Sequence, residues 1–263
     1  MSNAAAHARS YLPAPGTLLT QTDWGSLEHA LGPAVEAPEM LAALLEPDQA
    51  ARTKSLLYLD HVLHHQNTLY AATVPAALYV AAILSATHTE STIDNECRPL
   101  PDPLRTHLLD WMDSVAHEVT DEVAALSRKH GFPLRDYPPA LGIQEIRPLL
   151  FRAAHAHTSD SDLHVREAAV SACMPLLDDP RLHHHRSALV PLIRNVLGTG
   201  ARWQYRERAM DTLDAWGEDS SGIEGQQNPF EVCDGDQAPS PDSPSLWRTD
   251  KAHAHGYSED PPF

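Results

Sequence analysis

The chain has 263 residues, a formal net charge of −17 and a hydrophobic content of 42%. This acidity argues against general nucleic-acid binding, because the phosphate backbone is also negatively charged. Its three cysteines are odd in number and far apart, which is typical of a protein of the reducing cytoplasm and fits no metal-ligand spacing. We expect no secretory signal, and the longest apolar run, residues 71–84, is too short to cross a membrane.

In the N-terminal half, stretches with apolar residues at helical spacing alternate with residues that are typical of turns. Residues 1–20 are small and contain several prolines, so we expect a flexible leader there. Beyond it, apolar residues recur at spacings of three and four, the period of a helix with one buried face. This period predicts helices over residues 24–31, 38–45, 48–65 and 75–86. Gly32-Pro33 should separate the first two helices, and Asp48 should cap the third. Pro75 suits the first turn of the fourth, where its missing N–H costs nothing.

A polar, proline-containing loop over residues 87–103 leads into the C-terminal half. A long amphipathic helix is expected over residues 104–130, with a break near Thr120 and a left-handed cap at Gly131. The same period predicts further helices over residues 143–155, from 162 onward, over 182–197 and over 203–216. Residues 218–263 hold ten acidic and two basic residues and few aliphatic ones, so we expect an acidic, Pro-rich, disordered tail.

Two stretches of the chain open a helix in the same way. Asp48 and Asp162 are each suited to cap a helix, and each is followed four residues later by an arginine. A weaker third copy surrounds Arg206, which lies 40 residues after Arg166. A recurrence of about 40 residues is typical of stacked helix pairs. We therefore expect an all-α fold over residues 21–217, in the form of a HEAT-like or armadillo-like α-solenoid of antiparallel helix pairs.

The N-terminal half also carries a longer motif. It reads Trp24-x-x-Leu27-x-His29-Ala30-x-Gly32-Pro33-Ala34 and continues into His64-His65-Gln66-Asn67-Thr68-Leu69-Tyr70-Ala71-Ala72-Thr73. These residues resemble an uncharacterised family of HEAT-repeat proteins from Streptomyces and related actinobacteria, closely over 24–84 and more loosely over 104–216. One departure is Asn67, where the family has glycine, but asparagine tolerates the same left-handed conformation. The resemblance implies an α-solenoid used for protein contacts, without an established activity.

The sharpest local pattern in this motif consists of His65, Gln66, Thr68, Tyr70 and Thr73. Two interpretations remain open. In one, these polar side chains hold a tight turn between two helices. In the other, they form a protein-contact patch on one rim of the solenoid.

We expect no catalytic, metal or cofactor site. The sequence has no phosphate loop, nucleophile elbow or zinc-protease motif. His61 and His65 share a helix face, but they lack the further ligands that a metal site needs. The pair His117-Glu118 is the only His-Glu pair, whereas the HEAT-like enzyme deoxyhypusine hydroxylase uses repeated pairs to hold two irons.

Two functions therefore remain. The first is a scaffold or adaptor that binds a protein partner through the curved surface of the solenoid. The alternative is an immunity protein of the antitoxin type, which would occlude a basic toxin with its acidic surface. Either protein would act in the cytoplasm, without binding nucleic acid or membrane.

Overall fold

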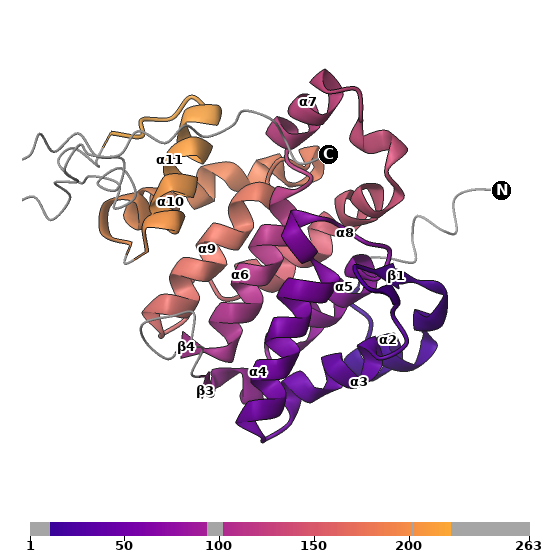
Figure 1. Ribbon diagram of the computed structural model, residues 1–263. Helices are drawn as coiled ribbons and strands as arrows, with labels where there is room; N and C mark the ends of the chain where they lie inside the picture. The colour runs from indigo at the N-terminus through magenta and orange to yellow at the C-terminus, as the bar shows by residue number, and fades with distance from the viewer. Residues whose placement is uncertain (1–10, 94–101, 201, 222–263) are drawn as a thin grey trace, which may run out of the picture. The chain divides into compact units, whose positions relative to one another are not determined.

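Helices make up nearly all the regular structure in the computed structural model of this protein (Figure 1). The structure describes residues 11–93, 102–200 and 202–221, all within one compact unit, Met1–Glu224. Within these residues the all-α prediction is confirmed. The predicted disordered tail from position 222 onward and the predicted leader up to position 10 lie outside the described residues.

Ten α-helices occur in the described residues. Their bounds are Pro15–Gln21 (α2), Ala37–Ala42 (α3), Gln49–Tyr58 (α4), Thr73–Ile83 (α5), Leu104–His117 (α6), Asp121–Lys129 (α7), Pro138–His155 (α8), Leu163–Leu176 (α9), Arg186–Thr199 (α10) and Trp203–Ala215 (α11). A π-helix, Leu59–Leu63, directly continues α4. Two short antiparallel ladders pair Glu28–His29 (β1) with Gly32–Pro33 (β2), and Thr92–Ile93 (β3) with Asp102–Pro103 (β4).

Both predicted aspartate caps are present. The Asp48 carboxylate accepts hydrogen bonds from the amides of Ala50 at 3.3 Å and Ala51 at 3.2 Å. Asp162 accepts from the amides of the second and third residues after it, at 2.8 and 3.1 Å. Such caps satisfy amides that have no partner inside the helix, and each is typically worth about 1 kcal/mol. The prediction that both aspartates open a helix is confirmed.

The first predicted helix pair is correct only in its second half. Residues 24–31 do not form a helix: Trp24–Ser26 is a single 3-10 turn, and β1 then pairs with β2 as a hairpin. Gly32 has a φ of +124°, which only glycine adopts readily. Its turn signal therefore closes a hairpin instead of separating two helices. The second half forms α3 and a 3-10 turn, Ala43–Leu45.

The helix α2 lies inside the stretch expected to be a flexible leader. Pro15 begins this helix, at a position where proline favours helix initiation. Leu18 is buried, and α2 packs against α3 and α5. The flexible-leader expectation therefore does not hold for residues 15–20.

The long helix predicted over residues 104–130 breaks near Thr120, as expected. The Thr120 hydroxyl accepts a hydrogen bond from the Val123 amide at 3.4 Å and so caps α7. Gly131, with a φ of +86°, takes the left-handed conformation predicted for the end of this segment. The two halves differ in burial, because most of α6 is buried whereas no residue of α7 is.

Helices that are distant in the sequence pack side by side. The helix α6 packs against α9, and α9 packs against α11, while α5 packs against α8. Figure 1 shows α6 and α9 running alongside each other, with α11 next to α9. The consecutive helices α8 and α9 also contact each other, as do α10 and α11. One core, mostly of leucine, alanine, valine and isoleucine, extends through all these contacts.

The three matched arginines make the same kind of contact. Each donates a hydrogen bond to a main-chain carbonyl that precedes its own helix, in the connecting segment for Arg52 and Arg166 and near the end of α10 for Arg206. The pairs are Arg52 with Pro47 at 3.3 Å, Arg166 with Asp160 at 2.6 Å and Arg206 with Leu197 at 2.9 Å. Since a guanidinium has several donors in a fixed fork, it can fasten a connecting segment in this way while its stem stays packed on the helix.

A proline inside α8 creates a further tie. Pro148 has no amide proton, so the carbonyl of Gln144 loses its partner within the helix. The Arg181 guanidinium donates to this carbonyl at 3.0 Å and to the carbonyl of Glu145 at 3.3 Å. Arg181 is in turn held by the Asp179 carboxylate, with 2.9 Å between Nε and Oδ1. The connection between α9 and α10 is thereby fastened to α8.

Candidate protein-contact site

The motif predicted from the sequence forms a tight turn between the π-helix and α5. Gln66 and Asn67 both have positive φ angles, 48° and 59°. The left-handed region is uncommon for residues other than glycine, although asparagine tolerates it. The expectation that Asn67 can take this conformation is confirmed, and Gln66 takes it as well.

Thr73 holds this turn from the inside. Its hydroxyl donates a hydrogen bond to the Leu63 carbonyl at 2.5 Å and accepts one from the Tyr70 amide at 2.8 Å. The Thr73 side chain is fully buried. This residue therefore fits the turn interpretation of the motif and offers no surface to a partner.

The other four residues of the motif differ in exposure. Gln66 and Thr68 are exposed, whereas His65 and Tyr70 are half-buried. Among the five, Thr68 alone lines the pocket beside the turn. The structure thus separates a buried anchor, Thr73, from an exposed tip formed by Gln66, Asn67 and Thr68.

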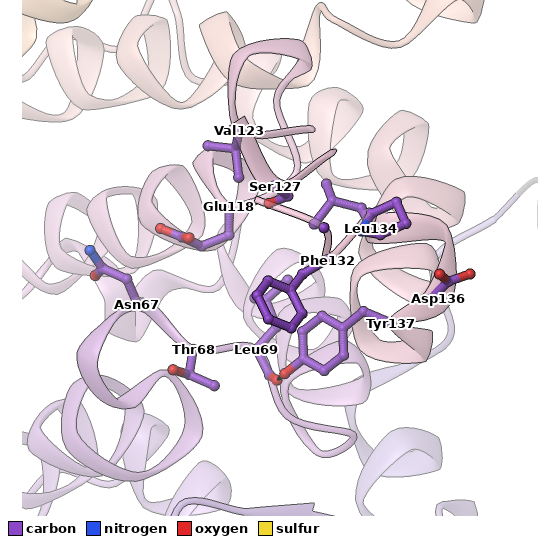
Figure 2. A pocket seen from close by; sticks show the side chains of 12 residues that line it. Asn67, Thr68, Leu69, Glu118, Val123, Ser127, Phe132, Leu134, Asp136 and Tyr137 are labelled. Atoms are coloured by element: carbon purple, nitrogen blue, oxygen red, sulfur yellow. Dashed lines mark hydrogen bonds between the residues drawn. The ribbon is translucent and has the colours of Figure 1, made fainter. Parts of the chain in front are cut away.

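Asn67 and Thr68 of the exposed tip form one side of a pocket of about 740 Å³ (Figure 2). We call this cavity the turn pocket. Its other sides come from the end of α6, from α7 and from the segment that joins α7 to α8. Besides Asn67 and Thr68, its walls include Glu118, Val123, Ser127, Phe132, Leu134, Asp136 and Tyr137. The Tyr137 hydroxyl donates to the Leu69 carbonyl, which ties the joining segment to the turn.

Apolar side chains of α7 and of the segment that follows it remain exposed. Phe132 is 79% exposed and Leu126 is 54% exposed. An amphipathic helix normally turns its apolar stripe towards the core. The sequence pattern places Val123 and Leu126 on such a stripe together with the buried face of α6. That expectation is wrong for α7, because the break at Thr120 redirects the helix and leaves its apolar side chains outside the core.

Glu118 is a carboxyl group in the wall of the turn pocket. Burial raises the pKa of Glu118 to about 7, and the positive charge of Arg208 opposes this rise only in part. Arg208 is already engaged by other groups: its Nε lies 3.1 Å from Asp113 Oδ2, and its Nη1 lies 2.9 Å from His117 Nδ1. The charge of an ionised Glu118 is therefore poorly compensated.

In the sequence, Glu118 stands out only as half of a His-Glu pair. One signal pointed to its position: Glu118 lies three residues after Val115, and so on the apolar side of α6. Several other pocket residues, Phe132 above all, come from a connecting segment that has no helical period. Their meeting with the turn at Asn67 depends on tertiary packing, which local patterns do not encode.

His64 lies directly before the turn and is buried against Trp111. The two rings meet edge to face, with 6.4 Å between their centroids and an interplanar angle of 87°. Burial lowers the pKa of His64 to about 4, so this histidine is neutral in the folded protein at neutral pH.

We expect His64 to make the protein less stable in mild acid. Between pH 6.5 and 4 the unfolded chain binds a proton that the folded His64 excludes, so the free energy of unfolding falls as the pH drops through this window. The loss attributable to His64 should approach about 3 kcal/mol near pH 4. Urea unfolding of the wild type and of His64→Gln at several pH values measures it.

The comparison with His64→Gln is needed because other groups titrate with the opposite slope. Burial raises the pKa of Asp113 to about 6 and that of Glu118 to about 7, so both favour folding at lower pH. These contributions are common to both proteins and cancel in the difference. If the wild type and His64→Gln had parallel stability curves from pH 4 to 7, His64 would not be held neutral by burial.

Other reactive groups are packed between helices. Cys173 is fully buried, and burial together with the nearby Asp113 charge raises the pKa of its thiol. Asp113 accepts a hydrogen bond from Ser171 at 2.9 Å and is itself buried. In the part of the chain that the structure describes, no three His, Cys, Asp or Glu side chains are arranged to hold a metal ion.

The fold and the turn pocket together define an all-α protein with an open, partly apolar pocket beside a left-handed turn. Comparisons with known protein families, with curated proteins and with solved structures find no match to this chain. Among the described helices, none is long and apolar enough to cross a membrane.

Proposed function

We propose that the protein is a non-catalytic scaffold or adaptor that binds a protein partner at the turn pocket. One observation carries this proposal: Phe132, in the wall of the turn pocket, stays 79% exposed. Exposed apolar groups that border a pocket with a few polar groups are typical of binding sites. The polar contribution comes from the turn, through Asn67 and Thr68.

We further propose that residues 21–217 form a HEAT-like or armadillo-like α-solenoid of antiparallel helix pairs. Two features support it. Helices two or three places apart along the chain pack together, as α9 does with α11 and α5 with α8. The matched arginines Arg52, Arg166 and Arg206 each donate a hydrogen bond to a main-chain carbonyl that precedes their own helix. Solenoids bind partners through surfaces built from equivalent parts of successive repeats.

The proposal includes no catalytic step, metal, cofactor, nucleic acid or membrane, and it places the protein in the cytoplasm. The burial of Asp113 and Cys173 between helices supports the absence of catalysis, since a substrate would have to enter the core to reach them. The net charge of −17 supports the exclusion of nucleic acid.

Replacing Phe132 with serine should remove the partner without unfolding the protein. Phe132 is largely exposed, so its substitution should change the free energy of unfolding by no more than about 0.5 kcal/mol. Loss of the aromatic ring from the wall should, however, reduce recovery of a bound protein at least tenfold, a change of about 1.4 kcal/mol. Affinity capture from cells that make the protein, followed by quantitative mass spectrometry, measures this.

Leu163→Ser serves as the matched control, since Leu163 is an exposed leucine at the start of α9 outside the turn pocket. We expect this variant to retain the partner. Equal recovery with Phe132→Ser and with the wild type would refute binding at the turn pocket. If the retained protein were a basic toxin, the same surface would serve the immunity function instead of a scaffold.

A further inference from the structure

The turn pocket is acidic. Its walls include two carboxylates, Glu118 and Asp136, and no basic side chain. Asp136 lies on the exposed rim, 3.8 Å from the Arg135 guanidinium. Glu118 lies deeper. The positive charge that acts on it is that of Arg208, and the Arg208 guanidinium already contacts Asp113 and His117. Of the two carboxylates, Glu118 is therefore the one left without a close cation.

The surroundings of Glu118 suit a cation on a long apolar stem. Figure 2 shows Phe132 and Tyr137 in the same pocket as Glu118, together with Val123 and Leu134. Lysine and arginine bury their aliphatic stems along apolar surfaces while their charged ends seek a carboxylate. The aromatic faces of Phe132 and Tyr137 would also attract a cation that lies over them. The pocket thus combines a carboxylate, an apolar wall and two aromatic rings, which together can recognise a lysine or arginine side chain.

The charge of the chain decides against two other occupants. A second copy would bring another net charge of −17 to an acidic pocket. Residues 218–263 of the same chain hold ten acidic and two basic residues, so they would also be repelled. Charge complementarity favours a basic segment of a different protein.

We infer that the turn pocket receives a lysine or arginine side chain from a basic, apolar-flanked peptide segment of another protein, with Glu118 as its counter-ion. This inference rests on the proposed function and specifies the partner's chemistry. The raised pKa of Glu118 is consistent with it, because a carboxylate that is desolvated without a partner gains most from an added cation.

Three fluorescein-labelled peptides of equal length can test this inference with the full chain. All three carry the same leucine and tryptophan residues, and they differ only in having four lysines, four glutamines or four glutamates at the remaining variable positions. Fluorescence anisotropy at pH 8 and low salt should show the lysine peptide binding at least tenfold more tightly than the glutamine peptide. The glutamate peptide should bind most weakly of the three.

Glu118→Gln and Glu122→Gln form a matched pair of variants. Both remove one negative charge, but Glu122 is exposed on α7 and does not line the turn pocket. Glu118→Gln should weaken the lysine peptide about tenfold and leave the glutamine peptide unchanged, whereas Glu122→Gln should change neither by more than about twofold. Circular dichroism checks that each variant is folded. Should Glu118→Gln fail to fold, Glu118→Asp, which shortens the side chain but keeps the charge, should still weaken the lysine peptide.

The outcomes separate the inference from the proposed function. If Phe132→Ala weakens the lysine and glutamine peptides alike while Glu118→Gln affects neither, apolar docking stands and the cation inference is wrong. If Glu122→Gln matches Glu118→Gln, the attraction belongs to the acidic chain as a whole, and the inference is again wrong. If neither Phe132→Ala nor Glu118→Gln affects any peptide, binding does not use the turn pocket, and both proposals fail.

Discussion

Replacing Trp111 with alanine should lower the free energy of unfolding by about 3–5 kcal/mol, the usual range for removing a buried tryptophan. Trp111 is only 3% exposed. Its indole N–H donates a hydrogen bond to the Leu59 carbonyl at 3.0 Å, and its ring packs edge to face with His64. The substitution therefore removes packing and leaves a buried carbonyl without this donor.

Urea unfolding followed by circular dichroism measures this loss, and Trp111→Phe separates its two causes. Phenylalanine keeps much of the packing but lacks the N–H, so its cost should be nearer to that of one buried hydrogen bond, about 1–3 kcal/mol. Because Leu59 opens the π-helix that leads to the turn, the alanine variant should also loosen the turn pocket. A loss below about 1 kcal/mol for Trp111→Ala would contradict the burial of this side chain.

The second large effect is expected at Arg105, which is 6% exposed. Its Nε donates to the Leu84 carbonyl at 2.7 Å, and its Nη1 lies 3.1 Å from the Asp160 carboxylate. It also reaches the Ala86 carbonyl at 3.5 Å. Replacement with methionine keeps the stem but leaves the Asp160 charge and two carbonyls without this donor. We expect a loss of about 3 kcal/mol, near the low end for removing one partner of a buried ion pair, because Asp160 is only half-buried.

Two controls define the origin of the Arg105 effect. Arg105→Lys keeps the charge but not the planar fork, so it should be intermediate between the wild type and Arg105→Met. Arg135→Met removes a guanidinium that is 81% exposed and should cost no more than about 0.5 kcal/mol. Thermal and urea unfolding of the three variants give the comparison. Equal losses for Arg105→Lys and Arg105→Met would mean that the fork geometry is what matters, and equal stability of Arg105→Met and the wild type would refute the buried ion pair.

The sequence predicts most helices because their signals are local. Asp48 and Asp162 cap their helices through amides two and three residues away, and the apolar period identifies the buried faces of α6 and α9 without any tertiary information. The sequence did not predict the hairpin at Gly32, because its signal is local only for the turn itself. A turn signal marks where the chain reverses, but it does not say whether helices or strands flank the reversal.

Of the candidate site, only the turn could be predicted from the sequence. Thr73 and Asn67 lie within ten residues of Leu63, so their roles follow from short-range geometry. Glu118 and Phe132 meet that turn only because α7 departs from the direction of α6 at Thr120. An apolar period reports which side chains share a face, but not whether a neighbouring element covers that face. Burial in α7 therefore had to be seen in the structure.

The tie between Pro148 and Arg181 has a consequence for how this chain can change in evolution. An ordinary residue at position 148 would restore an amide to α8, and that amide would compete with Arg181 for the Gln144 carbonyl. A substitution at either position thus changes how much the other residue contributes to the free energy of unfolding. The effects of the two substitutions should therefore not add, as is usual for residues that share one hydrogen-bond acceptor. Proline and arginine at these sites form a pair that sequence drift can replace together more easily than one at a time.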